Sequence, residues 1–175
     1  MQKSKQEIAE RANELTRKYM LKNHNCAQCV IAGVFETMGI EDKDVFRAAC
    51  GLARGVGGTG EGTCGAITGG VIAMSHLFGR KWDDFQDTAK IRKSVFLSRQ
   101  LMNKFQEKYG TSCCKDLQIK SVGRSFDPLI PGDLEAMQKT DLHEKCAAIS
   151  GETAHIVAEL IIEQQERETE RRKAS

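Results

Sequence analysis

The seven cysteines are the residues of this chain that could do the most chemistry. A cysteine thiolate binds metal ions and attacks disulfides, and seven in 175 residues is heavy usage. A secreted, disulfide-stabilised domain is usually shorter and carries a signal peptide, whereas the N-terminal segment here is charged and amphipathic without an apolar core. We therefore expect a cytoplasmic protein whose cysteines serve metal binding or redox chemistry. They are Cys26, Cys29, Cys50, Cys64, Cys113, Cys114 and Cys146.

Cys64 stands in the most unusual segment, GGTGEGTCGAITGG (57–70), which contains seven glycines. Glycine loses more backbone entropy on folding than any other residue, so this cluster indicates that backbone must approach something closely. Cys64 falls near the first turn of a predicted helix, where unpaired N–H groups and the helix dipole stabilise a thiolate. We expect Cys64 to be the reactive cysteine. Flanking glycines would let N–H groups approach a sulfur or a bound cofactor: Gly57, Gly58, Gly60, Gly62 and Gly65.

The same segment is a poor match to nucleotide-binding loops. Gly55, Gly57 and Gly60 satisfy G-x-G-x-x-G, but that motif needs a preceding strand within a βαβ unit, and a helix is predicted there. A Walker A loop would need Lys and then Ser or Thr after its last glycine, and this segment has neither in that place. We therefore set both nucleotide interpretations aside.

Two further cysteine pairs lie at predicted helix starts. Cys26 and Cys29 form a C-x-x-C, compatible with a redox pair or half of a metal site, and Cys26 is the better thiolate because it is nearer the helix start. Cys113 and Cys114 begin a short helix. Adjacent cysteines rarely bind one ion together, so we expect only one of these two to take part.

The last two cysteines differ in setting. Cys146 is predicted at the start of the final helix, three residues after His143, whereas Cys50 lies on an apolar face and is predicted to be a small core residue. Four separate helix starts thus each bring a cysteine. Helix N-termini that converge on one anionic centre would explain that repetition.

Apolar residues recur at helical spacing through nearly the whole chain, which predicts one all-α domain over residues 1–175 with six to seven helices. A glycine-rich loop precedes the central helix at about 64–78, and a long helix is predicted over 83–109. Residues 119–141 hold both prolines and have no clear period, so we expect an irregular segment with at most a short β-ribbon. The charged end at 163–175 is predicted to be a solvated helical tail.

Charge and hydropathy restrict the partners. Lys and Arg total 26 and Asp and Glu total 24, so the formal charge of +2 gives no electrostatic case for nucleic-acid binding. No segment reaches the ~18 apolar residues needed to cross a bilayer, so no membrane insertion is expected. A small helical protein with a glycine-lined site leaves apolar helix surface uncovered. Because two-fold pairs are the commonest assembly, we predict a homodimer.

Four segments resemble, in order, the family of redox-active proteins named for a C_GCAxxG_C_C motif. They are NHNCAQCV (23–30), GVGGTGEGTCGAITGG (55–70), GTSCCKDL (110–117) and HEKCAAI (143–149), and the central C-G-A-x-x-G begins at Cys64 and ends at Gly69. The resemblance covers about residues 20–160. It implies that the family's four cysteines are Cys26, Cys64, Cys114 and Cys146. Cys114 is preferred to Cys113 because it directly precedes the sequence KDL.

The family is in turn similar to the non-haem part of split-Soret cytochromes, which carry a cysteine-bound iron–sulfur centre. This chain has no C-x-x-C-H, so covalent haem is not implied. The favoured interpretation is an electron carrier that holds an iron–sulfur cluster of the two-iron kind, [2Fe–2S], and serves an unidentified redox partner protein. A metal-free thiol oxidoreductase or sensor, and a zinc site that includes His24 or His143, stay open as alternatives. Whether the protein is an enzyme is also open.

Overall fold

The protein is helical throughout the part that the computed structural model describes, residues 4–174. Within that range there are eight α-helices and no strand, which confirms the all-α prediction. The count exceeds the expected six to seven because the short helix α7 lies in the segment that was predicted to be irregular. The helices are α1 (Lys5–Asn23), α2 (Cys26–Met38), α3 (Lys43–Ala48), α4 (Gly65–Phe78), α5 (Arg92–Tyr109), α6 (Cys114–Val122), α7 (Asp133–Gln138) and α8 (Leu142–Lys173).

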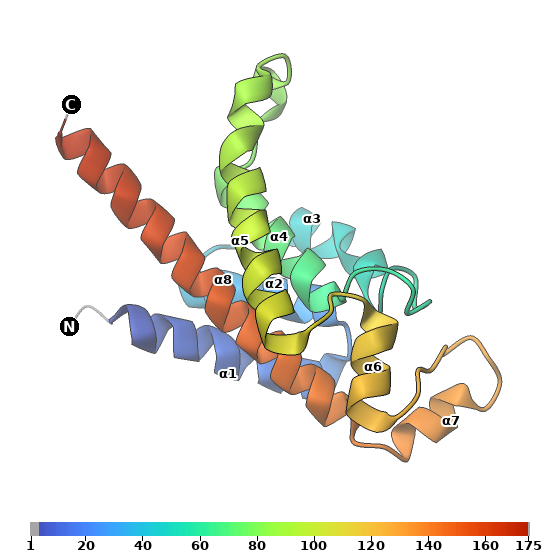
Figure 1. Ribbon diagram of the computed structural model, residues 1–175. Helices are drawn as coiled ribbons and strands as arrows, with labels where there is room; N and C mark the ends of the chain where they lie inside the picture. The colour runs from blue at the N-terminus through green and yellow to red at the C-terminus, as the bar shows by residue number, and fades with distance from the viewer. Residues whose placement is uncertain (1–3, 175) are drawn as a thin grey trace.

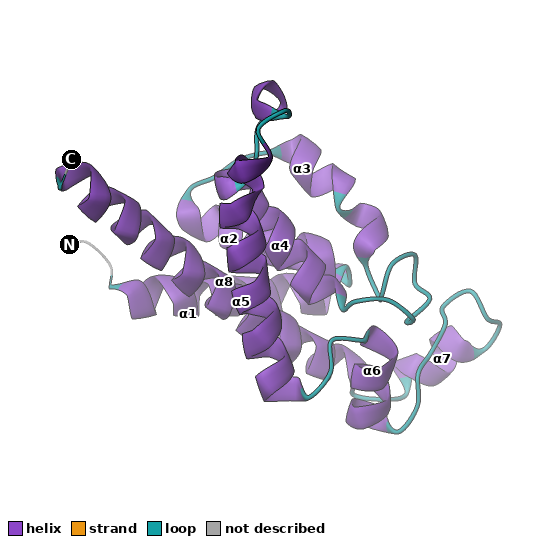
Figure 2. Cartoon of the chain, turned by 45° about the horizontal axis from the view of Figure 1, so that its top comes forward, coloured by secondary structure: helices purple, strands orange, loops and turns teal. Residues whose placement is uncertain are grey.

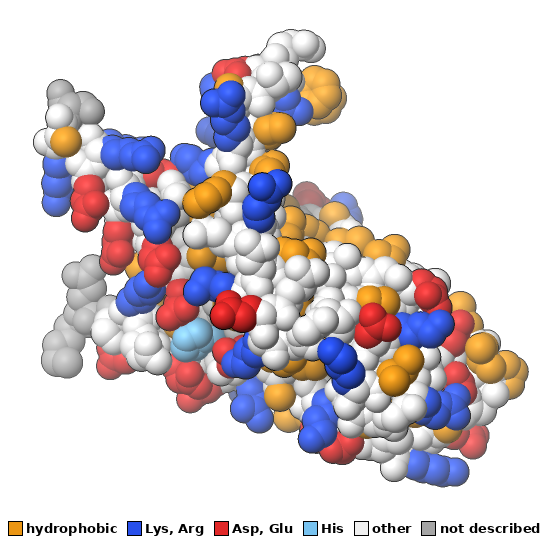
Figure 3. All heavy atoms as spheres, in the orientation of Figure 1, with side chains coloured by type: hydrophobic (Ala, Val, Ile, Leu, Met, Phe, Trp, Pro, Cys, Tyr) orange, Lys and Arg blue, Asp and Glu red, His pale blue; other side chains and the backbone are white. Residues whose placement is uncertain are grey.

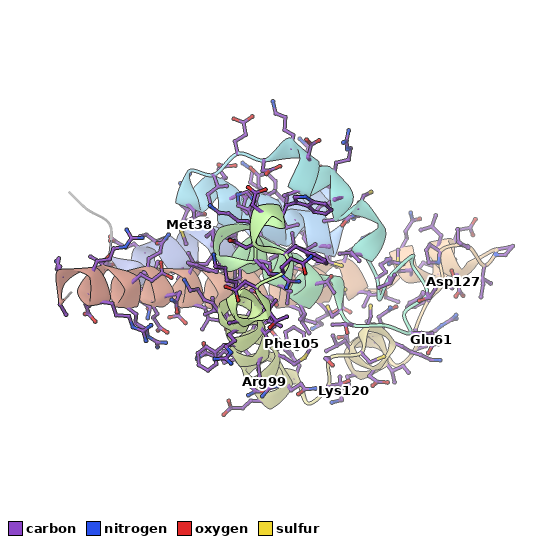
Figure 4. All side chains as sticks on the ribbon, turned by 90° about the horizontal axis from the view of Figure 1, so that it is seen from above. Met38, Glu61, Arg99, Phe105, Lys120 and Asp127 are labelled. Carbon is purple, nitrogen blue, oxygen red and sulfur yellow. The ribbon has the colours of Figure 1, made fainter. Side chains whose placement is uncertain are left out.

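The core lies between α8 and the helices that cross it (Figures 1 and 2). α8 packs along α1 and also contacts α2, α4 and α5. α4 is apolar on nearly all sides, as expected for a helix enclosed by others. Phe105 of α5 is fully buried in this core and is labelled in Figure 4. The solvated tail of α8 follows Gln164, its last buried residue.

Sequence signals place several helix ends correctly. Asn25 caps α2 because its side-chain oxygen accepts a hydrogen bond from the Gln28 N–H at 3.0 Å. Gly39 and Gly110 end α2 and α5 with backbone φ angles of 68° and 72°, a left-handed conformation that glycine adopts at little cost. The helix starts and ends around the cysteines are therefore fixed by local sequence.

The long helix predicted from residue 83 begins only at Arg92. Residues before it form two 3₁₀ turns, Trp82–Asp84 and Thr88–Ile91, because the Asp87 carboxylate accepts a hydrogen bond from the Ala89 N–H (3.0 Å) and starts a new turn there. The large apolar side chains of this segment lie outside the core: Trp82 is 87% exposed and Phe85 58%. This segment forms the arm that projects from the body in Figures 1 and 3.

The segment 119–141 is also more helical than predicted. α6 continues to Val122 and α7 lies within the segment, while both prolines, Pro128 and Pro131, fall in the loop between these helices. The described residues of this segment form no β-ribbon. The isolated β-bridge of the described chain joins Thr63 to Cys113 instead.

That bridge fastens the glycine-rich loop, residues 54–63, to the start of α6. The Cys64 N–H donates to the Ser112 carbonyl (2.8 Å), and the Cys114 N–H donates to the Gly62 carbonyl (3.0 Å). A third bond runs from the Lys115 N–H to the Gly60 carbonyl (2.8 Å). These bonds hold the first residues of α4 and α6 side by side. Figure 4 labels Glu61 on this loop and Asp127 on the loop after α6, at the same end of the molecule.

None of the helices described here has both the length and the apolar character that a bilayer crossing requires.

Candidate functional site: a four-cysteine cavity

Four cysteines from four different segments line one cavity at the end of the helix bundle. Cys26 belongs to α2, Cys114 to α6 and Cys146 to α8, and Cys64 is the residue directly before α4. The remaining lining is Met20, His24, Arg54, Leu117, Gln118, Ser121, Leu142, His143, Ile149 and Ser150. None of the described residues in this lining carries a carboxylate. The cavity therefore brings together the four cysteines that the family resemblance selected.

A glycine allows the first two cysteines to approach each other. Gly65 is the first residue of α4, and a Cβ atom built on it would lie 2.3 Å from Cys26 Sγ and 3.1 Å from the Leu52 carbonyl oxygen. Any side chain at this position would displace Cys26 from the cavity. Of the five glycines predicted to serve the cofactor, Gly65 thus has a direct steric relation to a site cysteine.

The other four glycines act differently from the prediction. Their N–H groups donate to carbonyl oxygens near or inside the same loop, so they are not directed at a sulfur. Gly57 donates to Gly51 (2.8 Å), Gly58 to Ala53 (3.3 Å), Gly60 to Arg54 (2.8 Å) and Gly62 to Gly55 (3.0 Å). These glycines close the loop on itself. They position the helix starts rather than contact the cavity.

Cys146 does not begin its helix as predicted. α8 starts at Leu142, which makes Cys146 its fifth residue, one turn inside. Its amide is therefore in the region where intrahelical hydrogen bonding begins, and the helix N-terminus contributes less to it than to Cys26 or Cys114. Cys146 nevertheless lines the cavity, together with Leu142 and His143 from the first turn of α8, and α8 contacts α6.

Burial, rather than the helix dipole, sets the direction of the pKa shifts of Cys64, Cys114 and Cys146. It raises the pKa of Cys64 well above the ordinary value, and the neighbouring site cysteines raise it further, while the Ala66 N–H opposes the shift. Burial also raises the pKa of Cys114, and that of Cys146 to about 12. Cys146 keeps some exposed surface as a residue, but protein surrounds its sulfur. The expected lowering by helix N-termini is therefore outweighed.

Arg54 is a site residue that the sequence interpretation missed. It lies in the loop with φ of 55°, a left-handed conformation that costs a non-glycine residue about 1 kcal/mol. Its Nη2 contacts Met137 Sδ, and its Nη1 is buried without a hydrogen-bond partner. No carboxylate pairs with it among residues 4–174. The available signal was a lone arginine inside a glycine-rich run.

Gln118 is the second site residue that was missed. It is buried on α6, and its Nε2 lies 3.4 Å from Cys114 Sγ. Its Oε1 accepts a hydrogen bond from the Phe126 N–H (3.1 Å), which fixes the amide so that its donor side faces the sulfur. This hydrogen bond opposes the effect of burial on the pKa of Cys114. Its sequence signal was the spacing of four residues, one helical turn, after Cys114.

The three remaining cysteines lie outside the cavity lining. Cys29 is buried against Met20 and Ala147, and burial raises its pKa to about 11. Cys113 Sγ faces the Gly60 carbonyl oxygen at 3.6 Å. Cys50 was predicted to be in the core, and this is wrong: it is exposed in the 3₁₀ turn Cys50–Leu52, where the helical period of α3 has already ended.

Two histidines complete the cavity on one side. The rings of His24 and His143 stack with centroids 4.1 Å apart, and burial, followed by the nearby charges of His24 and Arg54, lowers the pKa of His143. Among residues 4–174, no three His, Cys, Asp or Glu side chains are arranged to hold a metal ion. The zinc alternative therefore has no preformed site in this part of the chain.

A protein-family profile described as "Putative redox-active protein (C_GCAxxG_C_C)" matches residues 24–160. The chain belongs to this C_GCAxxG_C_C family. The C-G-A-x-x-G segment at the centre of the motif, residues 64–69, forms the start of α4. The match spans all four cavity cysteines. No curated protein and no solved structure shows significant similarity to the chain. Family membership gives the general conclusion, a redox-active protein. The cofactor and the reaction must be inferred from the cavity.

Proposed function

We propose that this protein binds an iron–sulfur cluster through Cys26, Cys64, Cys114 and Cys146 and carries electrons. One observation supports this proposal above the others. Cysteines that span positions 26 to 146 come from four separate segments and line one cavity, while the other three face elsewhere. Four thiolates are the usual ligand set of both two-iron and four-iron clusters.

Three features of the cavity fit such a group. The donor set is four sulfurs without a carboxylate, which suits soft iron–sulfur chemistry better than a hard cation. Gly65 leaves open the space that a Cβ would take beside Cys26 Sγ. The buried, unpartnered Nη1 of Arg54 lacks an anion. A two-iron cluster places two thiolates on each iron and a four-iron cluster one, so neither needs the three-ligand single-ion site that the described residues lack.

When bound, the cluster would supply one-electron chemistry. The protein's own contribution is to exclude water and to limit movement. Cys26, Cys64 and Cys114 are buried, and the loop bonds to Ser112 and Gly62 hold the last two of them in fixed relation. Such a rigid, dry site changes little between two charge states, which favours fast electron exchange.

Burial disfavours the metal-free dithiol alternative. A thiol that exchanges with a protein disulfide must be reachable and must ionise, and burial opposes both. Cys64, which would have to be the nucleophile, is among the buried ones. The exposed Cys50 and half-exposed Cys113 are not beside it in the cavity.

The test is metal and sulfide content after anaerobic assembly with iron and sulfide. Wild-type protein should hold both and absorb visible light, and Cys64→Ser should lose most of each because a serine oxygen is a harder ligand. Cys50→Ser, an exposed cysteine outside the cavity, is the matched control and should behave as wild type. Wild-type protein that contains neither iron nor sulfide would refute the proposal. Loss of disulfide formation alone in Cys64→Ser would favour the dithiol.

The cluster type, the redox partner protein and the homodimer stay predictions. Iron per chain and the paramagnetic signal of the reduced protein distinguish a two-iron from a four-iron centre. Light scattering distinguishes a dimer from the 19.4 kDa chain.

A further inference from the structure

We infer that Arg54 and Gln118 set the reduction potential of the four-cysteine centre, both favouring its reduced form; this rests on the proposed function. The two residues reach the same cavity from different segments, the glycine-rich loop and α6. Neither belongs to the cysteine motif by which the family is defined. Each presents nitrogen donors to a cavity in which the titratable anions are sulfurs.

Arg54 contributes a half-buried positive charge whose Nη1 atom is fully enclosed. Its guanidinium has no carboxylate partner among the described residues, and Nη1 is buried without a hydrogen bond. Leaving such a group uncompensated is costly, and the loop also holds the residue in a left-handed conformation to keep it there. A net negative group held by the four sulfurs would satisfy it. The chemical class that Arg54 recognises is thus a buried anion.

Gln118 contributes an oriented dipole. The Phe126 N–H occupies its oxygen, so its amide hydrogens are directed to Cys114 Sγ, 3.4 Å away. Rotating the amide by 180° would place two N–H groups face to face and leave the sulfur beside an oxygen. The amide is therefore a fixed donor to one sulfur of the centre, and hydrogen bonds to sulfur are a known determinant of cluster potential.

Both effects have the same sign. In a redox titration, one electron leaves a reduced mediator dye and enters the centre, so the cavity gains one negative charge. A buried positive charge and an N–H donor stabilise that added charge more than water-exposed groups can, because the surrounding dielectric constant is low. Arg54 and Gln118 should therefore raise the reduction potential. Lys115, next to Cys114 in sequence, is largely in solvent and pairs with Glu61, so it should matter little.

The experiment is a mediated anaerobic titration of the assembled protein, followed by visible absorption, with iron and sulfide measured in every sample. Arg54→Met keeps side-chain length without charge and should decrease the reduction equilibrium constant at least tenfold, equivalent to 59 mV for one electron. Gln118→Met should shift it in the same direction by less. Replacing Gln118 by glutamate would add a negative charge, which lowers the potential by itself and hides the effect of losing the amide. Methionine removes the amide without adding a charge. Lys115→Met is the control and should stay within threefold of wild type.

Potentials of Arg54→Met and Gln118→Met equal to or above that of wild type would overturn the inference. If Arg54→Met fails to assemble, the comparison of Arg54→Lys with Gln118→Met carries the test. Arg54→Lys keeps the charge, so its reduction potential should be closer to that of wild type than the potential of Gln118→Met. The reverse order would refute the inference. Wild-type protein without iron would instead refute the proposed function itself, so the two failures are distinguishable.

Discussion

The glycine-rich segment contains two regions whose glycines have opposite reasons to be there. In the loop, Gly57 and Gly58 have φ angles of 63° and 83°, and a Cβ on Gly57 would meet nothing within 4 Å. In α4, Gly65 and Gly69 have ordinary helical backbones, but a Cβ on either would collide with α2. Gly57 and Gly58 supply conformation, whereas Gly65 and Gly69 supply proximity.

The difference shows how the cavity is built. Positive φ angles let the loop turn back on itself and bond to the start of α6, which places Cys64 beside Cys114. Close packing of α4 on α2 then brings Cys26 to the same place. The two regions therefore fix different cysteines, and substitutions in them should fail in different ways.

The largest effect is expected from Gly69→Ala. Its Cβ would lie 2.4 Å from the Ala27 carbonyl oxygen and 2.9 Å from Ala27 Cα, both backbone atoms, so α2 and α4 must separate. Overpacking of this kind costs up to about 3 kcal/mol, and the better helix propensity of alanine returns about 1 kcal/mol. We expect the free energy of unfolding in urea to fall by about 2 kcal/mol. An unchanged or higher value would contradict the assignment of Gly69 to close packing.

Gly65→Ala should affect the site more than the fold. The nearest obstacle is Cys26 Sγ, a side-chain atom that can rotate away, so we expect a loss of about 1 kcal/mol in unfolding free energy. Iron and sulfide content after anaerobic assembly should fall severalfold because Cys26 leaves the cavity. Gly70→Ala, which meets the Val157 and Leu101 side chains instead, should lose stability and keep its metal content. Full content in Gly65→Ala would show that Cys26 is not needed.

Gly57→Ala isolates the conformational role. With free space around it, the substitution costs only the left-handed backbone of a non-glycine residue, about 1 kcal/mol. Gly57→Asn should recover part of this loss in the same urea measurement, because asparagine tolerates that conformation better. Equal stability of the two variants, or a loss as large as that of Gly69→Ala, would mean that Gly57 also has a packing role.

These two kinds of glycine could not be separated from sequence. The local signals were sufficient for the caps at Asn25 and Gly39, because a cap depends on a few neighbouring residues. They failed for the start of α5, where Asp87 begins a separate turn before the helix. Periodicity also misplaced Cys50, since a 3₁₀ turn after α3 changes which way a residue faces.

For the site, the motif identified the four cysteines that line the cavity and chose Cys114 over Cys113. Arg54 and Gln118 were missed because their local signals, a lone arginine in a glycine-rich run and a spacing of one helical turn after Cys114, do not by themselves indicate a site. Their roles depend on which residues α6, α8 and the loop bring together in three dimensions. The pKa of Cys64 could not be predicted for the same reason. A helix start can be recognised in the sequence, but the packing that buries Cys64 and raises its pKa cannot.

The smallest effect is expected outside both regions. Lys5 donates to Glu163 between α1 and α8, which lowers the pKa of Glu163 below its ordinary 4.5. The stabilisation is therefore present above that pH and disappears as pH falls through the folded-state pKa. Both side chains are about one-third exposed, so Glu163→Gln should cost at most about 0.5 kcal/mol at pH 7, and the cost should shrink as the pH falls below 4.5. A larger loss of unfolding free energy in urea would mean that this surface ion pair contributes as much stability as the close contacts of the glycines.

The central claim, that position in the cavity decides which cysteines bind the cluster, is tested most directly by two neighbours. Cys113 and Cys114 are adjacent in sequence, yet only Cys114 belongs to the cavity lining, while Cys113 faces the Gly60 carbonyl. Iron and sulfide should be measured in Cys113→Ala and Cys114→Ala after identical anaerobic assembly. The account predicts near wild-type content in Cys113→Ala and a loss of most of it in Cys114→Ala. Equal loss in both variants, or loss only in Cys113→Ala, would contradict it.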